Sequence, residues 1–130
     1  MDLHPELVET LVTTQDVLKR RPGSFHSLTD KATLVFSGQQ IESLGSFAGY
    51  AKSINRFKKW DLSQNYIPEI PDDLAAASKV EDICLAENML KSMKGFSGNQ
   101  FLKVLDLSTN HISKIEYLDN LPELRILVLF

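Results

Sequence analysis

Hydrophobic positions recur along this chain in a pattern that repeats about every 22 residues. Between residues 102 and 112, leucine or isoleucine stands at the first, fourth, sixth and eleventh positions, and asparagine stands at the ninth. The same pattern begins at Phe57 and again at Val80. Another copy opens at Leu124, and a degenerate first copy contains Leu34, Phe36, Gln39, Ile41 and Leu44. Five related segments therefore follow one another.

Alternation inside each copy predicts a short β-strand. Successive side chains of a strand point to opposite faces, so Trp60 and Leu62 face the interior while Asp61 between them faces outward. The same reasoning applies to Leu105 and Leu107. One segment cannot bury its own apolar face, and the copies must stack on one another to form a core. We expect five parallel strands, one from each copy.

An asparagine follows the strand in each regular copy. A short amide offers both a donor and an acceptor, and it can satisfy backbone groups that stacking removes from water. We therefore expect a structural asparagine ladder, formed by Asn65, Asn88 and Asn110.

The segments 60–65 and 105–110, Trp-Asp-Leu-Ser-Gln-Asn and Leu-Asp-Leu-Ser-Thr-Asn, resemble the conserved part of leucine-rich repeats. The resemblance covers residues 31–130. It is strongest to the short, 22-residue subclass typified by the nuclear regulator of protein phosphatase 1 and the spliceosomal leucine-rich-repeat subunit. Residues 67–71, Ile-Pro-Glu-Ile-Pro, look more like the longer typical repeats. In the short subclass, apolar residues follow each strand, here Met93, Phe96, Ile115, Leu118 and Leu121.

The resemblance implies an α/β solenoid, a right-handed superhelix with parallel β-strands on its concave face. Ahead of the repeats, residues 1–23 have an apolar stripe with helical spacing, Pro5 in the first turn, and Pro22 and Gly23 at the end. We interpret this segment as an amphipathic capping helix. Residues 24–56 form a linker and the degenerate first repeat, and residues 57–130 form the regular repeats, truncated in the last.

The sequence stops at Phe130, within the last predicted strand and before any asparagine or polar cap. A bare apolar strand at the end of a solenoid would pair with another chain or aggregate. We expect either missing C-terminal repeats or a partner that pairs with the edge at Phe130.

Composition narrows the classes of ligand. The 130 residues carry a net charge of -3, and the main basic cluster, Lys52, Arg56, Lys58 and Lys59, is split by apolar core positions. Direct nucleic-acid binding is not expected, because it requires a broad basic surface. No stretch approaches the roughly 20 apolar residues of a membrane span. The single cysteine fits a reducing compartment. We expect an intracellular protein, cytoplasmic or nuclear, without membrane contact.

Candidate chemistry is sparse. No phosphate-binding loop, nucleophile elbow or metal-ligand motif is present, and the three histidines fall at predicted surface positions. Asp61 and Asp106 occupy equivalent outward positions but lie two strands apart, about 9.5 Å, with Cys84 between them. Paired-acid catalysis is therefore not supported. We predict a protein that is not an enzyme and has no cofactor and no metal.

The outward strand positions predict a binding surface. Acidic residues fall in its middle and apolar residues toward its C-terminal end, an arrangement typical of protein interfaces. We expect a non-enzymatic adaptor that binds another protein through Lys59, Asp61, Asp82, Cys84, Val104, Asp106, Ile126 and Val128. Two alternatives remain: a solvated face without a specific partner, and the regulatory or substrate-recognition portion of a larger enzyme whose catalytic domain lies beyond residue 130.

Overall fold

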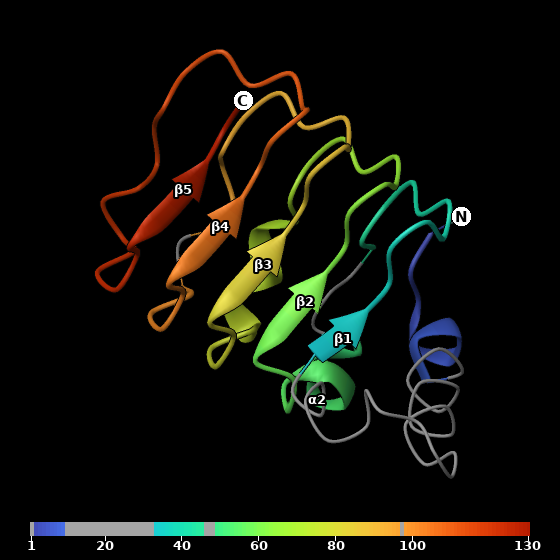
Figure 1. Ribbon diagram of the computed structural model, residues 1–130. Helices are drawn as coiled ribbons and strands as arrows, with labels where there is room; N and C mark the ends of the chain where they lie inside the picture. Colours follow the sequence, from blue (N-terminus) through green and yellow to red (C-terminus); the bar gives the residue numbers. More distant parts are fainter. Residues whose placement is uncertain (1, 10–32, 46–48, 97) are drawn as a thin grey trace, which may run out of the picture.

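The computed structural model describes residues 2–9, 33–45, 49–96 and 98–130. Five strands of three residues each form one parallel sheet in the order of the sequence (Figure 1). They are β1 (Thr33–Val35), β2 (Lys59–Asp61), β3 (Asp82–Cys84), β4 (Val104–Asp106) and β5 (Ile126–Val128). The predicted five-stranded parallel solenoid is confirmed.

The register of the sheet follows the repeat. The middle residues of the strands pair across it, so Leu34, Trp60, Ile83, Leu105 and Leu127 form one inward row. The first four of these side chains are buried. The Trp60 indole Nε1 also donates a hydrogen bond of 3.0 Å to the Phe57 carbonyl, which satisfies the only polar atom that this large side chain brings into the core.

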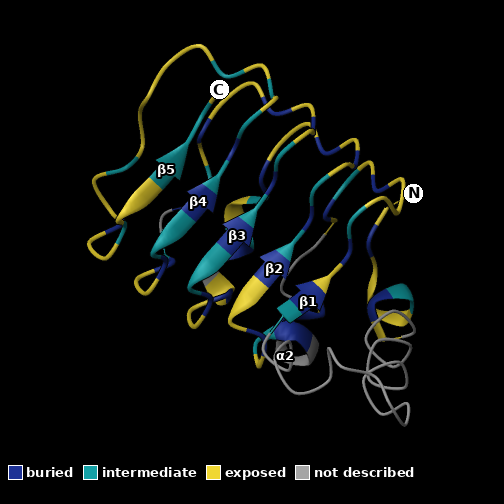
Figure 2. Ribbon diagram, in the orientation of Figure 1, coloured by how far each residue is buried: buried dark blue, intermediate teal, exposed yellow. Residues whose placement is uncertain are grey.

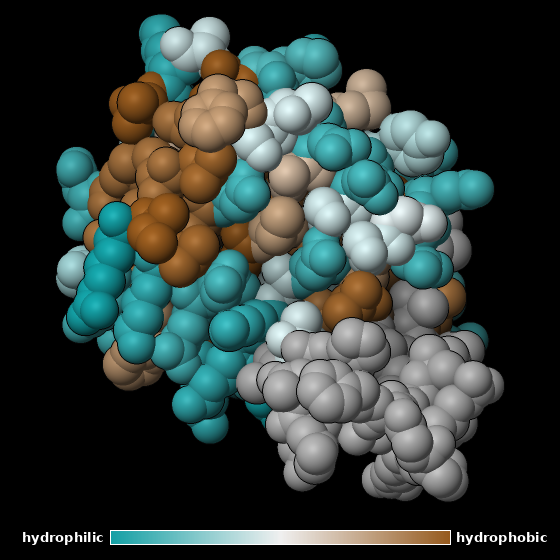
Figure 3. Space-filling model, viewed as in Figure 1, coloured by the Kyte–Doolittle hydropathy of each residue, from teal (hydrophilic) through white to brown (hydrophobic). Residues whose placement is uncertain are grey.

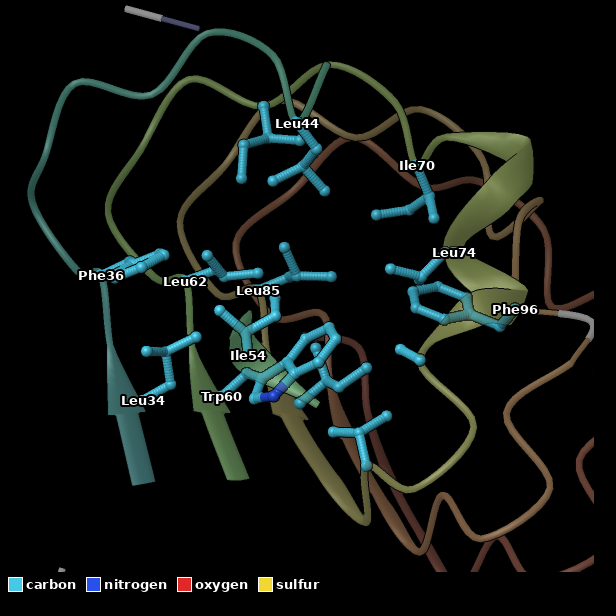
Figure 4. Close-up of a cluster of buried hydrophobic side chains, with 14 of the residues drawn as sticks. Leu34, Phe36, Leu44, Ile54, Trp60, Leu62, Ile70, Leu74, Leu85 and Phe96 are labelled. Atoms are coloured by element: carbon cyan, nitrogen blue, oxygen red, sulfur yellow. The ribbon is translucent and has the colours of Figure 1, made fainter. Parts of the chain in front are cut away.

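Turns form most of the layer behind the sheet. Its helical elements are α2 (Ala51–Ile54) and the 3-10 helix η3 (Asp72–Ala76) (Figure 2). Leu74 and Phe96 from this layer point toward the inward residues that directly follow the strands, including Leu62 after β2 and Leu85 after β3 (Figure 4). The core therefore lies between the strands and the returning turns of the same repeats.

Asparagine side chains join consecutive turns of the solenoid. Asn88 Nδ2 donates to the carbonyl of Leu62 in the preceding repeat and to that of Leu85 in its own, both at 3.0 Å. Its Oδ1 accepts from the Ile67 amide at 3.1 Å. Asn65 and Asn110 make the equivalent bonds in their repeats. Each amide thus satisfies backbone groups of two neighbouring repeats.

The first repeat ends this series. Gln39 stands where the later repeats have asparagine, but its side chain is exposed and its Nε2 donates to the Ser37 carbonyl of its own repeat at 3.3 Å. Its backbone amide instead donates to Asn65 Oδ1 at 3.0 Å. Among the described residues, the longer glutamine side chain therefore makes none of the bonds that the asparagines make between repeats.

The N-terminal segment packs against the first repeat. Residues 5–9 are helical, Leu3 and Val8 are buried, and the Leu3 amide donates to the Ser43 carbonyl at 2.9 Å. The rest of the predicted capping helix lies outside the described residues. None of the helices within those residues is long and apolar enough to cross a membrane.

The C-terminal repeat is less covered than the others. Of the apolar residues expected to follow the strands, Met93, Phe96 and Leu121 are buried and Leu118 is half-buried. Ile115 is 69% exposed. A residue of this type is buried only when an adjacent repeat covers it, and none of the described residues covers Ile115 from the C-terminal side.

Candidate partner-binding face

We call the outward residues of the five strands, with the residue two positions after each strand, the strand face. The register places them in three rows across the sheet. The rows are Thr33, Lys59, Asp82, Val104 and Ile126; Val35, Asp61, Cys84, Asp106 and Val128; and Ser37, Ser63, Ala86, Ser108 and Phe130. The eight residues that the sequence pattern selects for partner binding all lie within the first two rows.

Three carboxylates surround Cys84 in the centre of this face. Asp61 on β2 and Asp106 on β4 stand in register with Cys84 on either side. Asp82 lies two residues before Cys84 on the same strand and points to the same side. We call Asp61, Asp82 and Asp106 the acid cluster. Adjacent strands are about 4.8 Å apart, so the cluster concentrates negative charge within a small area.

The electrostatics of the acid cluster suppress thiol chemistry. Partial burial raises the pKa of the Cys84 thiol, and the three surrounding carboxylates raise it further, against a backbone hydrogen bond at Ala86 that lowers it. The Cys84 Sγ lies 3.9 Å from Asp106 Oδ2 as a weak donor. The thiolate is the nucleophilic form of cysteine, and this site favours the protonated form instead.

Asp82 also carries an electrostatic cost. Its pKa is raised, mainly by burial and to a smaller degree by Asp106, while Lys59 acts in the opposite direction. Lys59 stands beside Asp82 in the register and its side chain is exposed. Lys59 therefore offsets only part of the cost of burying the ionised carboxylate. A cationic group of a ligand would stabilise this ionised form further.

Two of the acids have a structural role that sequence reasoning missed. Asp61 Oδ1 accepts from the Ser63 amide at 3.0 Å and from the Ser63 hydroxyl at 2.6 Å. Asp106 Oδ1 accepts from the Ser108 amide at 3.0 Å. Both acids are half-buried, so they do more than point to solvent. The Asp-Leu-Ser spacing in both repeats is the sequence signal for this turn.

Apolar side chains dominate the other end of the face. Val104 and Val128 are half-buried, Ile126 is 52% exposed and Phe130 is 94% exposed. Figure 3 shows hydrophobic side chains gathered over β4 and β5, and mainly hydrophilic ones over β2 and β3. We call these four residues the apolar patch. It adjoins the acid cluster at β4, where Val104 and Asp106 belong to the same strand.

The other titratable candidates that the structure describes do not join this site. His4 and His111 are exposed, and His4 Nδ1 accepts from the Leu7 amide at 3.3 Å. His26 and the side chain of Lys52 lie outside the described residues. Within the described part of the chain, no three histidine, cysteine or acidic residues are placed to hold a metal ion together.

One buried polar residue was also missed. Asn99 is fully buried in a row that otherwise holds Ile54, Ala77 and Leu121. Its Nδ2 donates to the carbonyls of Leu74 and Ala77, at 3.2 and 3.0 Å, which end the 3-10 helix η3. This asparagine therefore has a structural role behind the sheet, far from the strand face. Nothing in its local sequence distinguishes it from a surface asparagine.

Solved structures with the same fold are known from several sources. An internalin, inlF, from Listeria monocytogenes matches 75% of this chain and 27% of its own, with 21% identity and a TM-score of 0.63. A chain from the Chaetomium Mex67:Mtr2 structure matches over 88% and 87%, with 19% identity and a TM-score of 0.58. The leucine-rich repeat domain of APL1B matches over 99% and 44%, with 16% identity and a TM-score of 0.56.

These likenesses establish the fold. The chain is a leucine-rich-repeat solenoid, although it spans only 27% of the internalin and 44% of the APL1B domain. No protein-family model matches the sequence, and no curated protein matches it. The assignment to the 22-residue subclass stays a prediction.

Proposed function

We propose that this chain is a non-enzymatic protein-interaction module that binds a segment of a partner protein along its strand face. The observation that carries the proposal is the division of that face into an acid cluster and an adjoining apolar patch. The acid cluster favours basic side chains, and the apolar patch favours hydrophobic ones. The partner segment we expect is therefore basic at one end and apolar at the other.

The dimensions of the sheet suit a short helix or an extended segment. From β1 to β5 there are four strand spacings, about 19 Å in all. A helix of about 13 residues covers that length at 1.5 Å per residue. Because hydrogen bonds between neighbouring strands hold the face in register, little ordering entropy is lost in the module when a segment binds.

The chemistry of the site supports binding in preference to catalysis. The raised pKa of the Cys84 thiol in its centre favours the protonated form, and the nearest acids make hydrogen bonds to their own turns. The cytoplasmic or nuclear location is part of the same proposal and rests only on the free thiol of Cys84, which suits a reducing compartment.

Site-specific photo-crosslinking tests where a partner binds. A benzophenone amino acid replaces Val104, at the border between the acid cluster and the apolar patch, in one variant. In a matched control it replaces Lys91, an exposed residue beyond the asparagine turn. We expect partner adducts with the Val104 variant and not with the Lys91 variant when the protein is irradiated in its native extract. Adducts of equal yield at both positions would contradict the proposal.

Neutralising two acids of the acid cluster then tests whether its negative charge contributes to partner binding. Asp61→Asn with Asp106→Asn keeps an acceptor oxygen for the serine turns and removes two charges. We expect the captured partner to bind at least about fivefold more weakly, while thermal unfolding changes little. Asp72→Asn with Asp119→Asn, two exposed acids behind the sheet, is the matched control. Equal affinities of the two double variants would rule out recognition by the acid cluster.

A further inference from the structure

Basic residues from different repeats meet where the strands begin. The residues directly before β2, β3, β4 and β5 are Lys58, Glu81, Lys103 and Arg125. Backbone bonds fix their order, because the Glu81 amide donates to the Lys58 carbonyl at 2.8 Å and the Lys103 amide to the Glu81 carbonyl at 2.7 Å. The Arg125 amide continues the series to the Lys103 carbonyl at 2.9 Å. The sequence alone groups Lys58 with Lys52, Arg56 and Lys59 and does not place Lys103 beside them.

A single carboxylate holds two of the cations. Glu81 Oε1 lies 2.9 Å from Lys103 Nζ, and Glu81 Oε2 lies 3.5 Å from Lys58 Nζ. The hydrogen bond from Lys103 is the largest cause of the lowered pKa of Glu81, and both ammonium groups contribute. The carboxylate therefore stays ionised while it positions two lysines, and the three groups together keep a net positive charge.

A second row of side chains lies two residues earlier in the sequence. Arg56, Lys79 and Phe101 occupy equivalent positions in three consecutive repeats. The Arg56 guanidinium carbon stands 4.3 Å above the centre of the Phe57 ring. Lys79 is exposed and forms no ion pair with the described residues. Phe101 is 52% exposed, which leaves an aromatic side chain among the cations.

These side chains enclose two adjoining hollows. One, of about 500 Å³, is lined by Arg56, Lys58 and Lys79 with Asn55. The other, of about 440 Å³, shares Lys58 and Lys79 and adds Glu81, Phe101 and Lys103. We call the combined depression the basic groove. Hydrophilic side chains cover the corresponding lower left edge of Figure 3, where the strands of Figure 1 begin. Four cations and one carboxylate line it, in a chain whose net charge is -3.

We propose that the basic groove binds a short acidic peptide segment with one apolar side chain, which packs on Phe101. Consecutive same-side residues of an extended peptide are about 6.6 Å apart, so two or three carboxylates reach cations from neighbouring repeats. Charge complementarity supplies the attraction, and Phe101 supplies a contact that a purely electrostatic surface lacks. This site is separate from the strand face and does not depend on the function proposed for that face.

A nucleic-acid strand is the less suitable occupant. The acid cluster begins on the same strands one to three residues beyond the groove, since Asp82 directly follows Glu81 and Asp106 lies three residues after Lys103. A long polyphosphate would be repelled there, and binding it without sequence preference requires a groove that continues along the backbone and several stacking aromatics. A short peptide needs neither.

Fluorescence anisotropy with labelled peptides tests the groove directly. The probes are hexaglutamate, hexaglutamate with a central leucine, hexalysine and an oligothymidylate of equal charge, each titrated with the full chain. We expect the leucine-containing acidic peptide to bind most tightly. Its affinity should fall as the salt concentration is raised. Lys79→Glu should weaken the binding of this peptide roughly fivefold or more, because Lys79 has no ion pair to lose within the described part of the protein. Phe101→Ala should abolish the advantage of leucine over plain hexaglutamate.

Lys91→Glu is the matched control, because it changes the net charge equally at an exposed lysine outside the groove. We expect the Lys91→Glu variant to keep most of the affinity for the leucine-containing acidic peptide. We expect the double variant Asp61→Asn with Asp106→Asn to bind this peptide no more weakly than the unchanged chain. Equal losses from Lys79→Glu and Lys91→Glu would overturn the proposal, as would no binding of either acidic peptide. If oligothymidylate binds more tightly than the peptides and depends on Lys79, the groove recognises phosphate and the proposal is wrong.

Discussion

The repeats around β3 and β5 share one sequence pattern but differ in burial. In the β3 repeat, Ile83, Leu85 and Asn88 are all buried between neighbouring strands. In the β5 repeat, Leu127 and Leu129 occupy the same inward positions and are only half-buried. The difference comes from the neighbours, because β3 is paired on both sides and β5 on one.

The stability that an inward side chain contributes to the fold therefore depends on the next repeat as much as on its own repeat. In a linear array, each unit contributes mainly through its interfaces with adjacent units. A leucine in the β5 repeat therefore stabilises the fold less than the same leucine one repeat earlier. The following substitutions test this statement in order of expected size.

The largest contrast is expected between Leu107→Ala and Leu129→Ala. Leu107 is 1% exposed, so its truncation leaves a cavity and should cost about 2–5 kcal/mol of unfolding free energy. Leu129 is already half-exposed to solvent, and its truncation should cost about 1 kcal/mol. Urea unfolding followed by circular dichroism measures both values. Equal costs would contradict the dependence on neighbours.

Adding a further repeat beside β5 gives a more stringent test with the same two variants. A chain extended after Phe130 by a second copy of residues 109–130 places another strand beside β5 at the same spacing. The cost of Leu129→Ala should then rise toward that of Leu107→Ala, while the cost of Leu107→Ala stays the same.

A smaller contrast is expected between two asparagines. Asn88→Ala leaves the Ile67 amide and the Leu62 and Leu85 carbonyls without this partner in a buried site, and it should cost about 3 kcal/mol. Asn110 makes equivalent bonds but is half-buried, so water can replace it and the cost should be about 1 kcal/mol. Asn120→Ala, at an exposed asparagine, is the control in the same urea series.

The smallest effect concerns Asp82 and depends on pH. Its pKa in the folded protein is raised above the ordinary value of 3.8, mainly by burial, so ionisation costs the folded state more than the unfolded one. Stability is therefore lost as pH rises from about the ordinary value through the folded pKa. Asp82→Asn should stabilise the protein at neutral pH by at most about 0.5 kcal/mol, because the side chain is only half-buried and solvent still screens its charge.

The gain from Asp82→Asn should disappear once the pH falls below the ordinary pKa of aspartate, where both states of the wild-type residue are protonated. Thermal unfolding at a series of pH values measures this difference. A gain that is independent of pH would show that packing, and not charge, causes it.

Strand positions and registers were predictable from the sequence because both follow from local rules. Alternation assigns Trp60 inward and Asp61 outward without knowledge of any neighbour. The 22- or 23-residue offset then aligns Asp61 with Cys84 and Cys84 with Asp106, as the register has them. The central position of the acid cluster on the strand face follows from these two rules alone.

The tertiary structure decided what the neighbours of each residue contribute. It buried Asn99, left Ile115 exposed, and brought Lys58, Lys79 and Lys103 together from three repeats. The physical reason is that burial and electrostatic pairing depend on groups about 20 residues away in sequence and one strand away in space. A periodic sequence fixes the direction of each side chain, while stacking determines what that side chain meets.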